Sequence, residues 1–427
     1  MNSFAIPAKL RLDNAANIYP ASMSKYYSSL YRMSMTLTDP VDPAILQEAL
    51  EQVSERIPTF RCRLKAGGFW WYLQRQDTIP QVLPLKKLAA FRFIDQHGFL
   101  YRVSADGHRI CLDVFHALTD GSGAMSFLAT LTAAYIHKRY QAQIQYNSLV
   151  LDPADRPIYR EVEDSFKAVF TGRKGELEKN VDAYHIGGAV MPGQHLMDVR
   201  AVASMQQVKQ ACQEMDCTVT DLVTAAMLAA LQDEYQADSC AKKRCSVLKV
   251  SVPVNLRPLY GSRTLRNFSS YVNLGVDVAD GYRNLRELVD AVKTQKEHDL
   301  QQENLEPKIA ANVQLEEMTL VKCLPLAVKH PIIDLINRLH GDRFYSQTLS
   351  NLGKVDLPEG MRPYVTDVDF VLGRQRGNSG AVACLGYNGK LCIHLSRKIF
   401  PARFEHAFLR HLESVGIATQ MTETALA

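Results

Sequence analysis

One segment limits the fold more than any other, because residues 109–140 change from one hydrophobic period to another across a glycine-bounded turn. Ile110, Leu112 and Val114 lie on one face of a period-2 pattern, which is typical of a β-strand. After Gly121-Ser122-Gly123, apolar residues recur at helical spacing, at positions 127, 128, 131, 134 and 135. The segment therefore predicts a strand, a tight polar loop and a helix.

Patterns of both kinds continue on either side. Asp42 and Pro43 predict the start of a helix that Pro58 ends. The pairs Asp106-Gly107 and Asn388-Gly389 predict hairpins, because both residues of each pair tolerate the positive φ of a primed turn. The remaining patterns predict strands at residues 69–73, 99–104 and 248–254 and helices at residues 219–235, 283–302 and 403–415, the last of which closes the chain.

The pattern weakens between residues 147 and 192, where prolines and glycines interrupt it. The 427 residues allow two or three folding units at roughly 150 residues each. We therefore predict an α+β protein of two similar-sized halves, residues 1–185 and 186–427.

Composition excludes several classes of protein. With 47% apolar and 22% charged residues, the chain is typical of globular proteins and unlike disordered ones. Its 49 Lys and Arg and 45 Asp and Glu residues are scattered, so no nucleic-acid-binding face is predicted. No stretch approaches the roughly 18 apolar residues of a membrane span, and residues 1–14 lack the apolar core of a secretory signal, so a cytoplasmic location is expected.

The nine cysteines form no CxxC pair and no His/Cys cluster with zinc spacing. Their number is odd, and most have apolar neighbours. We expect reduced, packed thiols and no metal site.

The residues that could carry chemistry are His116, Asp120 and Gly121, an H-x-x-x-D-G motif between the predicted strand and helix. The spacing alone has little specificity, but a histidine that leaves a strand into such a turn can be held by the sheet while its ring faces a cleft. Neutral imidazole can then accept a proton from a hydroxyl or amine that attacks a carbonyl. A packed histidine without chemistry is the alternative. By spacing, Asp120 could orient His116 as in a catalytic triad.

The motif resembles the signature of the superfamily of chloramphenicol acetyltransferase, peptide-synthetase condensation domains, BAHD acyltransferases and wax ester synthases. Stretches at residues 11–20 (RLDNAANIYP), 69–72 (FWWY), 253–257 (PVNLR) and 350–353 (SNLG) occur in order with it. With them the chain looks like the bacterial proteins labelled alcohol acetyltransferases, and the resemblance covers essentially the whole chain.

The resemblance implies two chloramphenicol-acetyltransferase-like α/β sandwich halves that form a V with a central tunnel. An acyl thioester donor and an acceptor would enter from opposite faces and meet at His116, the general base. Asp120 would be a structural acid that pairs with an arginine, and Arg257 is the candidate partner. This role for Asp120 is favoured over the triad role.

Three further residues have expected roles. Gly121 is expected to give the turn its backbone freedom. Ser350 and Asn351 match a stretch that lies near the tunnel in relatives, so either is a candidate hydrogen-bond donor to the oxyanion. With Gly353 they could equally well form only a turn.

The sequence departs from two relatives. Phe115 stands where condensation domains have a second histidine, which weakens a peptide-bond-forming role. Residues 369–373 (DFVLG) match the DFGWG stretch of BAHD enzymes only in part, which argues against a close BAHD relationship.

We therefore expect direct acyl transfer from acyl-coenzyme A, or from an acyl carrier protein thioester, to a small-molecule alcohol. No bound cofactor and no metal are expected. A covalent intermediate is not required either, since Cys111, the nearest cysteine, lies on the opposite strand face from His116 by parity. Two other functions stay open. One is amide formation on an amine with a carrier-bound donor, and the other is non-catalytic binding on the same fold. The two-halved layout is compatible with a monomer.

Overall fold

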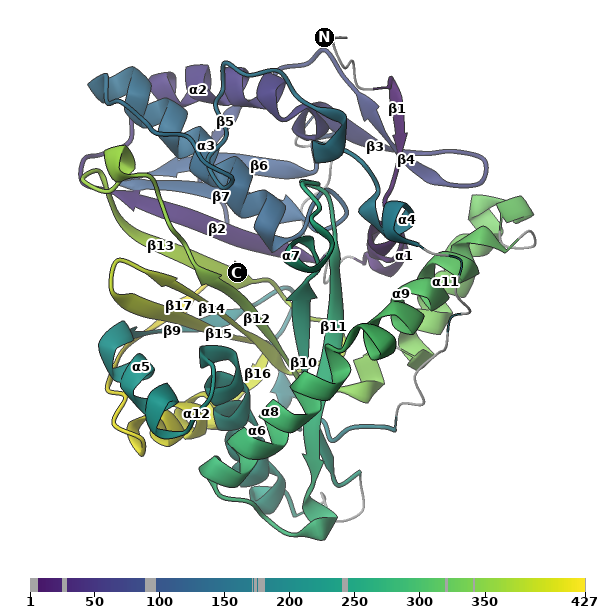
Figure 1. The fold of residues 1–427 in the computed structure, drawn as a ribbon, viewed down its shortest axis with the longest axis vertical. Helices are drawn as coiled ribbons and strands as arrows, with labels where there is room; N and C mark the ends of the chain where they lie inside the picture. Colours follow the sequence, from purple (N-terminus) through teal and green to yellow (C-terminus); the bar gives the residue numbers. More distant parts are fainter. Residues whose placement is uncertain are drawn as a thin grey trace.

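The computed structural model describes residues 7–24, 29–88, 97–170, 172, 175, 181–239, 245–318, 322–340 and 342–426. The chain is an α+β protein with two lobes, each built on a mixed sheet with helices against it (Figure 1). The boundary between residues 185 and 186 stays a prediction.

The first lobe contains a five-stranded sheet. Its strands, in spatial order, are β13 (Val365–Leu372), β2 (Leu30–Leu37), β7 (Arg109–Phe115), β6 (Tyr101–Asp106) and β5 (Val82–Pro84). Helices α2 (Pro43–Arg56) and α3 (Gly121–Tyr140) pack side by side on the sheet (Figure 1). The predicted strand, loop and helix at residues 109–140 are thereby confirmed.

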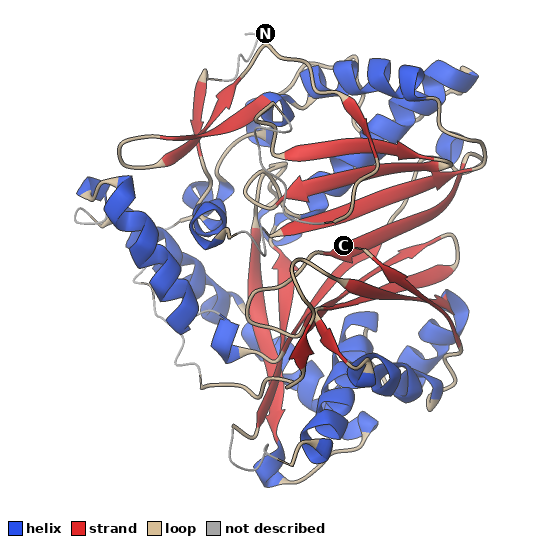
Figure 2. Cartoon of the chain, turned by 180° about the vertical axis from the view of Figure 1, so that it is seen from behind, coloured by secondary structure: helices blue, strands red, loops and turns tan. Residues whose placement is uncertain are grey.

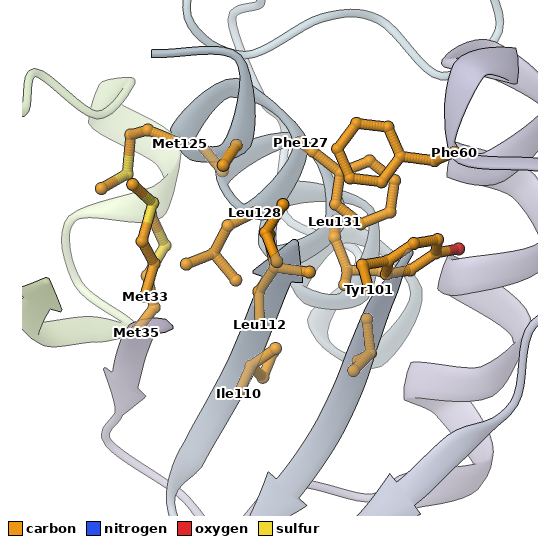
Figure 3. Packing of buried hydrophobic residues seen from close by; sticks show 14 of the residues in the cluster. Met33, Met35, Phe60, Tyr101, Ile110, Leu112, Met125, Phe127, Leu128 and Leu131 are labelled. Atoms are coloured by element: carbon orange, nitrogen blue, oxygen red, sulfur yellow. The ribbon is translucent and has the colours of Figure 1, made fainter. Parts of the chain in front are cut away.

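The core of this lobe lies between α3 and the sheet. Figure 3 shows side chains of β2, β7 and β6 meeting those of α3, among them Met33, Met35, Ile110, Leu112, Tyr101, Phe127, Leu128 and Leu131. α3 is buried continuously from Gly123 to Ile136 rather than on one face, because the segment after it folds back over its outer side. Ser126 Oγ donates to the carbonyl of Leu149 (2.7 Å), and the N–H of Leu151 donates to Thr130 Oγ1 (3.0 Å).

The second lobe contains a seven-stranded sheet. Its strands, in spatial order, are β11 (Ser269–Asp277), β10 (Val247–Asn255), β12 (Gln347–Lys354), β14 (Gly380–Tyr387), β15 (Lys390–Arg397), β9 (Met197–Ser204) and β17 (Thr419–Ala425). Helices α5 (Met205–Glu214), α6 (Val219–Ala237), α8 (Leu285–Asp299) and α12 (Arg403–Glu413) lie together on one side of this sheet (Figures 1 and 2).

Smaller elements complete the fold. A three-stranded sheet is formed by β1 (Lys9–Arg11), β4 (Trp71–Arg75) and β3 (Cys62–Ala66), and β8 (Ala189–Val190) pairs with β16 (Ile399–Phe400). The remaining helices are α1 (Ile18–Ser22), α4 (Ser165–Val169), α7 (Arg257–Tyr260), α9 (Gln302–Glu317) and α11 (Leu326–His340), and α11 packs against α1.

Turn and cap chemistry explain the ends of several elements. The Asp42 carboxylate accepts hydrogen bonds from the N–H groups of Ala44 and Ile45 and caps α2, as the sequence predicts. Asn388 and Gly389 both have positive φ (45° and 73°), which confirms that hairpin. The other hairpin is displaced by one residue, because Asp106 pairs with Arg109 and only Gly107 has positive φ (57°).

Two strands change the expected topology. The helix at residues 403–413 does not close the chain, because β17 follows it and pairs antiparallel with β9. β13 comes from the second half of the sequence but pairs with β2 of the first lobe, while it also contacts β14 and β15 (Figure 1). β13 therefore connects the two lobes.

The described cysteines are all free thiols, whereas Cys240 lies outside the described residues. Among the residues described, no helix combines the length and apolar character that crossing a bilayer requires.

Candidate active site

His116 is the first residue after β7. Its N–H donates to the carbonyl of Ser29 (3.1 Å), and the N–H of Leu118 donates to the carbonyl of Phe115 (2.9 Å), which closes the turn. Phe115 and Ala117 are fully buried, whereas His116 is only partly buried. The turn is thus anchored in the core while His116 keeps accessible surface.

Asn267 fixes the orientation of the His116 ring. Its Oδ1 lies 3.0 Å from His116 Nδ1, and its Nδ2 donates to Asp13 Oδ2 (3.2 Å). Since only the amide nitrogen can donate to a carboxylate, Asn267 Oδ1 must face the ring and accept a proton from Nδ1. The lone pair of His116 is therefore on Nε2.

Burial shifts the pKa of two groups in this hydrogen-bonded chain. It lowers the pKa of His116, and the nearby Asp120 carboxylate and the bond to Asn267 oppose this only in part. It raises the pKa of Asp13 to about 6, although the Arg266 guanidinium acts against it. His116 is consequently neutral near pH 7, as a proton acceptor must be.

Two tyrosines contact the His116 ring. Tyr19 of α1 stacks on it with the ring centroids 4.4 Å apart and the planes at 20°. Tyr31 of β2 meets it edge-on at 5.3 Å, and its hydroxyl donates to the carbonyl of Thr119 (2.9 Å). Together with the bond to Asn267, these contacts restrict rotation of the imidazole.

Asp120 caps α3 and pairs with Arg257, the partner expected from the sequence. The Arg257 guanidinium donates to both oxygens of Asp120 (Nη1 to Oδ2, 2.8 Å; Nη2 to Oδ1, 2.9 Å). The carboxylate also accepts from the N–H groups of Gly123 (3.0 Å) and Phe268 (2.9 Å). Burial favours the protonated acid, but the Arg257 charge and these bonds lower the pKa of Asp120 below its ordinary value.

Arg257 also holds the loop that carries Asn267. Its Nε donates to the carbonyl of Thr264 (2.7 Å) and its Nη2 to that of Arg266 (2.5 Å). Since Arg257 and backbone donors engage both oxygens of Asp120 and Asn267 contacts Nδ1 of His116, the geometry gives Asp120 a structural position and Asn267 the orienting one.

Gly121 of the motif and Gly123, two residues after it, are both constrained by packing. Gly121 has no positive φ, so the expectation that its backbone needs a glycine is wrong. A Cβ at Gly121 would lie 2.7 Å from the terminal Cδ2 of Leu352, whereas one at Gly123 would lie 2.1 Å from Thr119 Oγ1 and 2.2 Å from the carbonyl oxygen of Leu265. Gly123, which the sequence did not single out, is thus the stricter requirement.

Gly123→Ala is expected to lower the free energy of unfolding by about 1–3 kcal/mol, because backbone must move to admit the new methyl group. Gly121→Ala is its matched control and should cost less, because only the end of a flexible leucine must move. Denaturant unfolding of both variants measures the difference. Equal losses would contradict the assignment.

Ser350 and Asn351 occupy different faces of β12. Asn351 Nδ2 donates to Thr220 Oγ1 (3.0 Å) and its Oδ1 accepts from the N–H of Gly353 (2.8 Å), so its amide is engaged within the second lobe. Residues 350–353 lie within strand β12, so the alternative that they form only a turn is wrong. Leu349 packs in the second-lobe core, so Ser350 lies on the opposite face, the face that Leu352 presents to the first lobe. Of the two residues, Ser350 is therefore the one on the face toward the first lobe, and its role at the oxyanion stays a prediction.

Cys111 offers no nucleophile for His116. The thiol is buried, and burial raises its pKa to about 11, so it is protonated at neutral pH.

Sequence reasoning missed two members of this site, Asn267 and the role of Asp13. Asp13 lies in the RLDNAANIYP stretch, but its function there depends on Asn267, which lies 254 residues further along the chain. No local spacing could have linked either of them to His116.

Two mixed sheets joined by β13, with the histidine turn contacting residues of both lobes, define the chloramphenicol-acetyltransferase-like condensation fold. Polyketide synthase associated protein 5 from Mycobacterium tuberculosis is 16% identical with a TM-score of 0.64, over 96% of this chain and 99% of that one. F. graminearum TRI101, solved with coenzyme A and deoxynivalenol, is 11% identical with a TM-score of 0.65, over 97% and 99%. The starter condensation domain of rhizomide synthetase is 15% identical with a TM-score of 0.56, over 96% and 94%.

No protein-family model and no curated protein sequence matches the chain. At the identities above, the similarity to solved structures shows the fold.

Proposed function

We propose that this protein is an O-acyltransferase that moves an acyl group from acyl-coenzyme A to the hydroxyl of a small-molecule alcohol. One observation carries the proposal. The Asp13–Asn267–His116 chain orients the imidazole so that its basic nitrogen Nε2 is not used by the bond to Asn267, and burial lowers the pKa of the ring and keeps it neutral. The similarity to TRI101, whose structure contains coenzyme A, supports the donor. The proposal includes the resemblance, noted from the sequence, to alcohol acetyltransferase-like proteins in particular.

In the proposed mechanism, donor and acceptor meet at His116 in a tunnel between the lobes. His116 Nε2 takes the proton from the acceptor hydroxyl as its oxygen attacks the thioester carbonyl. The tetrahedral intermediate then expels the coenzyme A thiolate, and His116 Nε2 transfers the proton to that thiolate. The Ser350 hydroxyl is the candidate donor to the oxyanion, and Asp120 and Arg257 keep the turn and the Asn267 loop together.

An amide-forming condensation reaction is the second candidate, and the similarity to the starter condensation domain favours it. The second histidine of condensation domains is missing here, because Phe115 occupies its position and is fully buried in the core.

A thiol-release assay tests the proposal. Purified protein is mixed with acyl-coenzyme A donors of increasing chain length, each with alcohols, with amines or with no acceptor. We expect release that depends on an alcohol. Release with amines alone would favour condensation, and no release under any condition would favour a binding protein.

Asn267→Ala is expected to lower kcat by roughly 10- to 100-fold and leave the KM for donor nearly unchanged, because the ring loses its fixed tautomer but not its place. Steady-state kinetics with a saturating acceptor measure this. Asn351→Ala, which removes an amide engaged with Thr220, is the matched control and should retain activity. A rise in the donor KM of Asn267→Ala with no fall in kcat would contradict an orienting role.

The rate should also depend on pH in one direction. The base must be neutral, and the pKa of His116 is lowered by burial, so kcat/KM should stay level at neutral pH and fall only below the ordinary histidine pKa of about 6.5. An acidic limb above that value would show that a different group, or an exposed histidine, controls the rate.

A further inference from the structure

A second group of ionisable side chains lies where the two lobes join. Asp369 is on β13, which pairs with β2 in the first sheet, whereas Cys392 and His394 are alternate residues of β15 in the second sheet. β13 lies against β15 (Figure 1). Cys392 and His394 are 3% and 5% exposed. In the first-lobe sheet, Asp369 pairs with Ser34, and Ser34 pairs with Cys111 of β7. Cys111 lies five residues before His116 along the strand, so this group is separate from the candidate active site.

The potential ligand atoms of these three residues converge. Asp369 Oδ1 lies 3.1 Å from Cys392 Sγ and 3.0 Å from His394 Nε2, and all three atoms lie within 4.8 Å of one another. In a tetrahedral zinc site, bonds of about 2.0–2.3 Å put neighbouring ligand atoms roughly 3.4–3.7 Å apart. The two distances from Asp369 Oδ1 are therefore within a few tenths of an ångström of those in a zinc site, and the third pair, Cys392 Sγ and His394 Nε2, lies within 4.8 Å.

The surroundings are those of an oriented metal-binding histidine. His394 Nδ1 lies 2.6 Å from Asp198 Oδ2, the arrangement in which a carboxylate fixes the tautomer of a histidine that binds metal through Nε2. Arg200 Nε donates to Asp369 Oδ1 (2.7 Å) and orients that carboxylate. The other oxygen of Asp198, Oδ1, is buried without a hydrogen-bond partner in the described structure, so the protein's own donors leave part of the negative charge unmet.

Charge balance permits a buried dication here. Without metal, His394 contacts carboxylates through both ring nitrogens, so both carry protons, and the Cys392 thiol donates to Asp369. On binding, one proton leaves His394 Nε2 and one leaves Cys392 Sγ, both to solvent, as the dication enters. The net charge of the cluster is unchanged, so the ion adds no uncompensated buried charge.

We propose that Asp369, Cys392 and His394 bind one zinc-class ion that ties β13 of the first-lobe sheet to β15 of the second. The mixed sulfur, nitrogen and oxygen donors suit Zn²⁺ or Co²⁺ and are unsuited to Mg²⁺ or Ca²⁺, which prefer oxygen alone. With three protein ligands, the fourth position of the ion is left to a water molecule. The proposed site links the two lobes and does not depend on the proposed acyltransferase function.

Cobalt(II) titration of the chelator-treated full chain tests the site, with exposed Cys323 replaced by serine throughout. We expect one equivalent of Co²⁺ to produce a thiolate-to-cobalt absorption band that Zn²⁺ abolishes. Cys392→Ala should not show the band, and its affinity for Zn²⁺ should be at least 10-fold lower than that of the parent protein. Cys111→Ala, which removes another buried thiol, is the matched control and should keep both.

A second variant separates metal binding from folding. Asp198→Asn should keep the thiolate band and weaken Zn²⁺ roughly 10- to 100-fold, because it acts through His394. Zn²⁺ should also raise the Tm of the parent protein but not that of Cys392→Ala. If the parent protein binds no stoichiometric Zn²⁺, or if the band survives in Cys392→Ala, the site does not exist.

Discussion

Arg257→Ala is expected to lower the free energy of unfolding by about 3–5 kcal/mol, because it leaves a buried carboxylate without its counter-charge. Asp120 is only 5% exposed and would keep just the N–H groups of Gly123 and Phe268. The variant also frees the carbonyls of Thr264 and Arg266, so the loop that carries Asn267 should loosen and activity should fall with stability.

Denaturant unfolding of Arg257→Ala measures the loss. Arg343→Ala is the matched control, because Arg343 donates to both oxygens of Asp182 but both side chains are about half exposed (48% and 50%), and it should change stability little. Asp120→Asn combined with Arg257→Ala should recover part of the loss, since no unpaired charge is left. Equal stabilities of Arg257→Ala and Arg343→Ala would show that the ion pair is not structural.

The elements that carry the motif could be predicted because their signals are local. Residues 109–140 contain the change from period 2 to helical spacing, and Asp42 and Asn388-Gly389 act within a few residues of themselves. The partner of Asp120 could be proposed only through family resemblance, because Arg257 lies 137 residues away.

The rest depended on contacts that no pattern encodes. β17 is an edge strand whose residues are almost all exposed, so it has no apolar alternation to detect. β13 has strand-like residues, but nothing in them specifies that it pairs with β2 of the other lobe. Asn267, and the convergence of Asp369 with Cys392 and His394, likewise appear only when distant strands are brought together.

His116→Ala is expected to lower the rate of acyl transfer by roughly 10²- to 10⁴-fold, because the acceptor hydroxyl then has no positioned base. Binding of the thioester should persist, since the turn is anchored by backbone bonds and by the Asp120–Arg257 pair rather than by the imidazole. Tyr19 would lose its stacking partner, so a modest loss of stability is expected as well.

His195→Ala supplies the matched control, because it removes an exposed imidazole whose one described hydrogen bond is to the backbone carbonyl of Pro192 in its own loop. It should leave the transfer rate and thioester binding unchanged. A comparable loss of rate in both variants would point to a general effect on folding.

The most direct measurement is alcohol-dependent thiol release by wild type and His116→Ala at matched occupancy of acyl-coenzyme A, with occupancy taken from donor-binding titrations of both proteins. The account predicts that wild type releases thiol only when an alcohol is present and that His116→Ala binds the donor but releases almost none. Full transfer by His116→Ala, or a stoichiometric burst of thiol from wild type without acceptor, would contradict direct transfer by this histidine.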